Sequence, residues 1–125
     1  MTTPLRIGIA GAMGRMGHAV AAAIEAREDA NVAARFDRPE LAVGGYVSRD
    51  EALGVCDVII DFTVPEATVA LARAAAERGV ALVIGSTGLS PADEAAVAEA
   101  ARSVPVVRTG NFSLGVNVMI GLVRQ

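Results

Sequence analysis

The chain has 125 residues, the length of a single domain, and carries a formal net charge of −3, with no basic tract that would suit nucleic acid. No apolar run approaches the roughly 20 residues of a membrane span, and no signal peptide is recognisable at the N-terminus. The single cysteine, Cys56, excludes an internal disulfide, fits a cytoplasmic protein and is expected to be buried and unreactive.

The first segment of the chain carries its strongest motif. An apolar, strand-like run at residues 5–10 ends in Gly11, Gly14 and Gly17, and a helical stretch follows. Glycine tolerates the backbone angles of such a turn, and the free N–H groups and dipole at a helix start attract phosphate. The motif predicts the pyrophosphate-binding corner of a dinucleotide fold. Because Met13 replaces the second glycine of the common G-x-G-x-x-G spacing, a tightly packed turn without a ligand is the alternative.

Strand-like and helix-like segments then alternate along the chain. Strands are predicted at residues 5–10, 31–36, 58–62, 81–84 and 105–108, and helices at about 15–27, after Ser48, at 65–78, after Ser90 and from about 113. Such alternation predicts an α/β fold, a Rossmann-type doubly wound parallel sheet in a single domain. The last helix places Val116, Met119, Ile120 and Val123 on one face, for which the predicted elements offer no partner.

Polar residues follow the predicted strands at the edge where such sheets bind ligands. Asp37, after the second strand, can accept hydrogen bonds from the adenosine ribose, and the Arg38 guanidinium can pair with a 2′-phosphate. Together they predict binding of both NADH and NADPH, with a solvated loop pair as the alternative. After the fourth strand, the hydroxyls of Ser86 and Thr87 can meet a nicotinamide carboxamide, or can simply cap a turn.

The combination of segments 11–17, 61–66, 83–88 and 111–117 resembles the cofactor-binding domain of the dihydrodipicolinate reductase (4-hydroxy-tetrahydrodipicolinate reductase) family, over essentially the whole chain. The resemblance implies an oxidoreductase of lysine and diaminopimelate biosynthesis, which transfers hydride from NADH or NADPH to a cyclic, unsaturated dicarboxylate. By the family pattern, the cofactor-binding residues are Gly11, Ala12, Met13, Gly14, Arg15 and Met16 at the pyrophosphate, Asp37 and Arg38 at the adenosine, and Gly85, Ser86, Thr87, Thr109, Gly110, Asn111 and Phe112 at the nicotinamide.

The catalytic residues of that family have no counterpart in this sequence. They are a His-His pair and a lysine of a second domain, whereas this chain has no lysine and one histidine, His18, expected on a helix surface. We therefore expect residues 1–113 to be the cofactor domain and 114–125 to begin a helix that leads to a missing substrate domain. The chain alone is expected to bind cofactor without turnover, with no catalytic residue and no metal site, and the full-length protein is expected to be a homotetramer.

Two alternatives remain open. One is a non-catalytic nucleotide-binding module, such as a redox-sensing or CoA-binding domain, which would share the glycine corner. The other is the cofactor domain of a different two-domain dehydrogenase, with other residues at 61–66 and 111–117.

Overall fold

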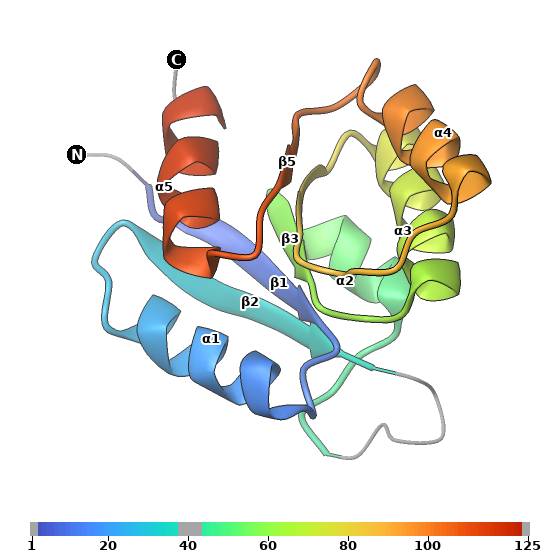
Figure 1. The fold of residues 1–125 in the computed structure, drawn as a ribbon. Coiled ribbons are helices and arrows are strands. Elements are labelled where there is room, and N and C mark those ends of the chain that lie inside the picture. The colour runs from blue at the N-terminus through green and yellow to red at the C-terminus, as the bar shows by residue number, and fades with distance from the viewer. Residues whose placement is uncertain (1–2, 38–43, 124–125) are drawn as a thin grey trace.

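The computed structural model describes residues 3–37 and 44–123 and contains one five-stranded sheet (Figure 1). In chain order the elements are β1 (Leu5–Ala10), α1 (Arg15–Glu25), β2 (Ala30–Phe36), α2 (Arg49–Val55), β3 (Val58–Asp61), α3 (Pro65–Arg78), β4 (Ala81–Ile84), α4 (Pro91–Ala100), β5 (Val106–Arg108) and α5 (Phe112–Val123). The strand order is β2-β1-β3-β4-β5, and every neighbouring pair is parallel. The predicted doubly wound α/β fold is confirmed.

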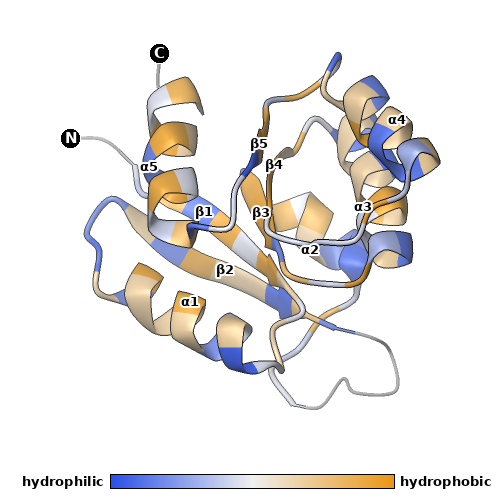
Figure 2. Cartoon of the chain, in the orientation of Figure 1, coloured by the Kyte–Doolittle hydropathy of each residue, from blue (hydrophilic) through white to orange (hydrophobic). Residues whose placement is uncertain are grey.

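Helices cover both faces of the sheet. One core lies between the sheet and helices α1 and α5, and the other lies beneath α2, α3 and α4. Alternate residues of β1 supply the two cores, since Ile7 and Ile9 belong to the first and Ala10 to the second. Every residue of β3 and β4 is buried, which explains why their sequences are apolar except for Asp61 at the end of β3; the apolar part of β3 is orange in Figure 2.

The helix ends follow the signals in the sequence. The Ser48 Oγ accepts a hydrogen bond from the Glu51 N–H at 3.1 Å, and Ser90 and Asp93 form a reciprocal capping box at the start of α4. Gly79 ends α3 with a φ of +73°, in the left-handed region that favours glycine. The remaining differences are of one or two residues. Helix α1 ends two residues before its expected end and β3 one residue before, while β2 and α5 begin one residue earlier than expected and β5 one residue later.

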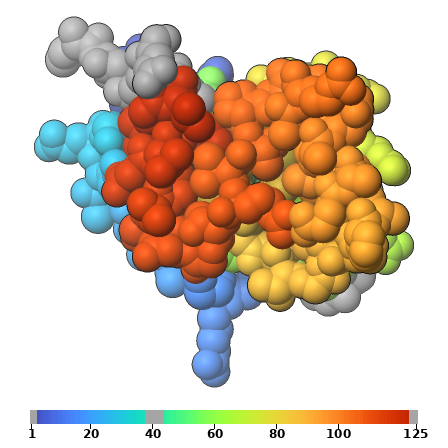
Figure 3. Space-filling model, turned by 45° about the horizontal axis from the view of Figure 1, so that its top comes forward, coloured from blue at the N-terminus to red at the C-terminus, as the bar shows by residue number. Residues whose placement is uncertain are grey.

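Helix α5 corrects one expectation. Its apolar face was expected to lack a partner, but Val116 and Met119 are almost completely buried against β4 and β5. Gly115 allows this close approach, because a Cβ there would lie 2.8 Å from Val83 Cγ1. The helix covers the part of the sheet that α1 leaves open, and it forms part of the surface seen in red in Figure 3. Leu114, Val118 and Leu122 of this helix are exposed. The division of the chain at residue 113 stays a prediction.

Among the described residues, no helix has the length and apolar character needed to cross a membrane.

Candidate cofactor-binding site

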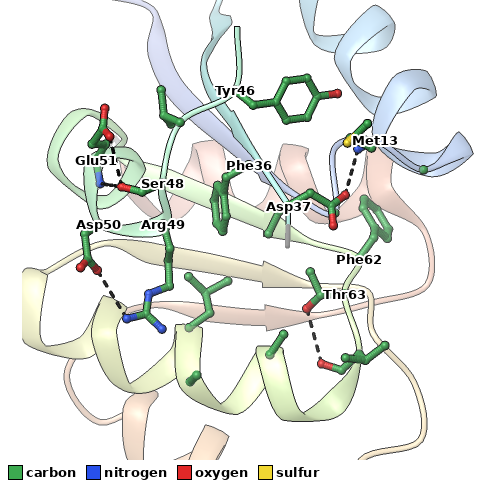
Figure 4. A pocket seen from close by; sticks show the side chains of 18 residues that line it. Met13, Phe36, Asp37, Tyr46, Ser48, Arg49, Asp50, Glu51, Phe62 and Thr63 are labelled. Atoms are coloured by element: carbon green, nitrogen blue, oxygen red, sulfur yellow. Dashed lines mark hydrogen bonds and ion pairs between the residues drawn. The ribbon is translucent and has the colours of Figure 1, made fainter. Parts of the chain in front are cut away.

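The order in which the chain adds strands to the sheet reverses between β1 and β3. Helix α1 carries the chain from β1 to β2 on one side, and the following segment returns it across β1 to β3 on the other. Loops diverge at such a switch point and leave a crevice at the carboxyl edge of the strands. A pocket of about 1250 Å³ lies there, between the β1–α1 turn, the end of β2, the start of α2 and the first turns of α3 (Figure 4).

Glycine is favoured at the three glycine positions of the β1–α1 turn for different structural reasons. Gly11 has a φ of +81°, which disfavours a side chain. At Gly17 a Cβ would lie 2.6 Å from the Ala12 Cα, so only glycine lets α1 approach the turn this closely. At Gly14 the nearest atom to a Cβ would be the Gly11 carbonyl oxygen, at an ordinary 3.6 Å. Packing within the protein therefore does not require glycine at position 14, which lines the pocket, and the open space there suits the close approach of a ligand.

Most N–H groups of this turn are used within the protein. Gly11 and Ala12 donate to the Phe36 carbonyl at 3.0 and 3.2 Å, Met13 donates to Asp37 Oδ2 at 3.1 Å, and Gly14 donates to the Gly11 carbonyl at 3.2 Å. The next two residues, Arg15 and Met16, begin α1, and the first N–H groups of a helix have no carbonyl one turn back. Of the residues expected at the pyrophosphate, Arg15 and Met16 in this first helical turn therefore have the N–H groups that can bind it. The Ala12 side chain is part of the core.

Asp37 connects the end of β2 to the glycine turn. Its carboxylate points at Met13 in Figure 4 and lines the pocket. A carboxylate has about four lone-pair positions, so Asp37 can hold this turn and also accept ribose hydroxyls. Arg38, expected at the 2′-phosphate, lies outside the described residues. Among the described residues that line the pocket, the positively charged side chain is that of Arg49. Its Nη2 lies 3.4 Å from Asp50 Oδ1.

The walls of the pocket contain residues that the sequence analysis did not identify. Tyr46 and Arg49 come from the segment entering α2, and Ala67, Ala70 and Leu71 come from one side of α3. Nothing in the local sequence distinguishes these residues from ordinary helix and loop residues. Only the topology indicates that they line the pocket, because α2 and α3 flank the switch point on the same face of the sheet.

The residues expected at the nicotinamide lie outside the lining of this pocket, at the ends of β4 and β5 on the same edge of the sheet. Thr87 is exposed, whereas Ser86 is buried, with its hydroxyl 3.0 Å from Asp61 Oδ2 and 2.7 Å from Thr68 Oγ1. The Ser86 hydroxyl is thus directed into the protein, although both hydroxyls were expected to face the cofactor.

The turn after β5 is organised by its own side chains. The Thr109 Oγ1 accepts a hydrogen bond from the Asn111 N–H at 2.9 Å, and Asn111 Oδ1 accepts one from the Leu114 N–H at 3.0 Å. Asn111 therefore caps α5, a role that the sequence analysis did not assign. Gly110 is exposed beside it, and the ring of Phe112 packs against the core shared with α1.

Two further residues lie where the sequence indicated. His18 is exposed on α1, as expected for a helix-surface residue. Cys56 is buried, and burial raises the pKa of its thiol to about 11, so it is not a reactive thiol. In the described part of the chain, no three His, Cys, Asp or Glu side chains gather as metal ligands.

These features together define a class of protein. A parallel sheet with a glycine turn, a helix start and an acidic residue at its switch point is a dinucleotide-binding domain of the Rossmann type. The family model described as "Dihydrodipicolinate reductase, N-terminus" matches residues 5–112. The chain therefore belongs to the dihydrodipicolinate reductase family, as its N-terminal domain.

Sequence relatives agree with this assignment, and a solved structure shares the fold. The chain is 57% identical to a 4-hydroxy-tetrahydrodipicolinate reductase of Caulobacter vibrioides, over 100% of the chain and 49% of that protein. It is 44% identical to one of Anaeromyxobacter dehalogenans, over 96% of the chain and 50% of the relative. The dipicolinate-bound dihydrodipicolinate reductase of Paenisporosarcina sp. TG-14 superposes with a TM-score of 0.75 at 19% identity, over 94% of the chain and 51% of that structure. The chain thus spans about half the length of these relatives.

Proposed function

We propose that this chain is the NADH- and NADPH-binding half of a 4-hydroxy-tetrahydrodipicolinate reductase, which forms tetrahydrodipicolinate in lysine and diaminopimelate biosynthesis. The observation that carries the proposal is the open space at Gly14, beside the start of α1 and next to Met13, whose N–H donates to Asp37. Sequence relatives with this name, matched over half their length, support the reaction.

Each part of the site has a proposed task. The N–H groups of Arg15 and Met16 would hold the pyrophosphate, which the turn from Gly11 to Gly14 admits. Asp37 would accept the ribose hydroxyls, and Arg38 would pair with the 2′-phosphate of NADPH. The turns 85–87 and 109–112 would line the nicotinamide. When bound, the cofactor supplies the hydride.

The remaining half of the reaction needs a proton donor and cationic partners for the substrate. Reduction of a C=N bond requires a proton for the nitrogen, and a dicarboxylate requires cationic partners. The chain has no lysine, and its one histidine is exposed on α1, where α1 packs beside the glycine turn. We therefore propose that turnover of the cyclic dicarboxylate depends on the second half found in the relatives. A homotetrameric full-length enzyme in the cytoplasm belongs to the same proposal and rests on the family resemblance.

Calorimetric titration of the purified chain with NADH and with NADPH tests the cofactor proposal. Both are expected to bind, within about tenfold of each other, a difference of roughly 1.4 kcal/mol. Absence of binding to either dinucleotide would overturn the proposal. Binding of CoA in place of both would instead establish a non-catalytic nucleotide module.

The role of Arg38 has its own test. Arg38→Ala is expected to weaken NADPH while leaving NADH unchanged, because only NADPH carries the 2′-phosphate. Arg102→Ala is the matched control, since Arg102 is exposed in the turn after α4 and pairs with Glu99. Equal losses for both cofactors in Arg38→Ala would show that Arg38 does not contact the 2′-phosphate.

A further inference from the structure

A fully buried carboxylate ends the central strand β3. Asp61 is 0% exposed, and the ion pairs of the described residues do not include it. Burying a charge without a cation costs several kcal/mol unless hydrogen bonds replace the lost water. An apolar residue of similar size would serve the core as well or better. What the carboxylate adds is the orientation of its hydrogen-bond donors. The groups that donate to it therefore indicate its role.

Four donors surround the Asp61 carboxylate. Its Oδ1 accepts from the Thr63 N–H at 2.9 Å and from the Thr63 hydroxyl at 2.5 Å. Its Oδ2 accepts from the Thr68 hydroxyl at 2.5 Å and from the Ser86 hydroxyl at 3.0 Å. Thr63 lies in the β3–α3 turn that lines the pocket, Thr68 lies on α3, and Ser86 lies in the β4–α4 turn. One side chain therefore connects two neighbouring turns of the ligand-binding edge and the helix between them.

The backbone of the same residue reinforces the connection to the β4–α4 turn. The Asp61 carbonyl accepts a hydrogen bond from the Gly85 N–H at 2.8 Å. A Cβ at Gly85 would lie 2.6 Å from Phe62 Cε1, so the turn packs closely on the residue that follows Asp61. The end of β3 thus fixes residues 85 and 86 through hydrogen bonds and close packing. The exposed Thr87 comes immediately after them.

We propose that Asp61 is a positioning residue for the nicotinamide half of the cofactor. By holding the Ser86 hydroxyl inward, it fixes the turn so that the Thr87 side chain and the backbone of residues 85–87 face the nicotinamide. Ser86 then acts through its buried contact with Asp61 and does not touch the cofactor. This inference rests on the proposed dinucleotide site and assigns to Asp61, Thr68 and Ser86 one shared task within it.

The buried position of Thr68 provides the sharpest test. Thr68 is 1% exposed, so it cannot contact a cofactor directly. Thr68→Val keeps the shape of the side chain and removes the hydroxyl that donates to Asp61 and meets Ser86, whereas Thr68→Ser keeps the hydroxyl. Each variant is titrated with NADH and with ADP-ribose, which contains the same adenosine and pyrophosphate but no nicotinamide. Urea unfolding and circular dichroism confirm that each variant is folded.

For Thr68→Val we expect NADH to bind about tenfold more weakly and ADP-ribose to stay within about twofold, the size of effect that one charge-assisted hydrogen bond supports. Thr68→Ser is expected to bind both ligands as the unaltered chain does. If Thr68→Val does not fold, Ser86→Ala is measured in the same way and is expected to show the same selective loss.

The remaining outcomes separate this inference from the proposal on which it rests. Equal weakening of NADH and ADP-ribose in Thr68→Val, or no weakening of either, would overturn the positioning role of Asp61. The same holds if the unaltered chain binds NADH no better than ADP-ribose, because the turn would then make no contact with the nicotinamide. Failure of the unaltered chain to bind either ligand would overturn the dinucleotide site itself, and this inference with it.

Discussion

The glycines of the β1–α1 turn allow a prediction that separates folding from binding. A Cβ at position 17 would lie 2.6 Å from both the Ala12 Cα and the Gly11 carbonyl oxygen, whereas nonbonded carbon atoms pack best at about 3.5–4.0 Å. Both neighbours are backbone atoms in a turn that is fixed by hydrogen bonds to Phe36, so α1 must move to relieve the contact. At Gly14 the same added methyl would meet its nearest protein atom at 3.6 Å and would enter the space beside the pocket.

We expect Gly17→Ala to destabilise the chain. Overpacking costs about 2 kcal/mol at the middle of its usual range, and the better helix propensity of alanine returns up to about 1 kcal/mol, which leaves a net loss of about 1–2 kcal/mol. The urea midpoint should fall by about 1 M, given a slope of about 1–3 kcal/mol per M. Gly14→Ala should lower the midpoint less than Gly17→Ala, since it meets no close protein atom and replaces only the N-cap glycine of α1. It should weaken NADH about tenfold or more, because the methyl would hold the pyrophosphate away from the helix N–H groups.

Urea titrations followed by circular dichroism, together with NADH calorimetry on both variants, test this pair. A Gly17→Ala chain with an unchanged midpoint would refute the close approach of α1 to the turn. Unchanged NADH affinity in Gly14→Ala would show that the open space at this position does not face the ligand.

Two further predictions concern ionisable groups near the amino ends of β1 and β3. The Arg6 guanidinium donates to Asp57 and holds the pKa of that carboxyl below its usual value. The ionised Asp57 therefore stabilises the fold above about pH 4, and this stabilisation is lost as the pH falls further. The urea midpoints of the unaltered chain and Asp57→Asn should differ at pH 7 and converge toward pH 3; a constant difference would contradict this. Because burial raises the pKa of Cys56 to about 11, a disulfide reagent at pH 8 should modify the thiol slowly in the folded chain and rapidly in urea, and equal rates would show that the thiol is accessible.

The sequence predicted the elements well where the signal is local. The runs at β3 and β4 could be recognised because a strand buried on both faces is rich in apolar residues, and Gly79 marked the end of α3 because its left-handed φ favours glycine. The docking of α5 was missed because which surface a helix covers depends on the space left by the other helices. That space becomes visible only when the whole sheet is assembled.

The site was predicted in part for the same reason. Gly11, Gly14 and Asp37 come together as expected, since each lies within a few residues of the end of β1 or β2. The direction of the Ser86 hydroxyl could not be inferred, because it depends on Asp61, which lies 25 residues earlier in the chain. A signal was nevertheless present: an aspartate ends an otherwise apolar strand, and such a group needs buried donors.

The composition of the pocket has a practical consequence. The chain contains one tyrosine and no tryptophan, and that tyrosine, Tyr46, lines the pocket (Figure 4). Its ultraviolet emission is therefore an intrinsic optical reporter located at the binding crevice. NADH and NADPH absorb in the region where tyrosine emits, so occupancy of the crevice would dim this single fluorophore through energy transfer, and titrations could be followed without attaching any dye.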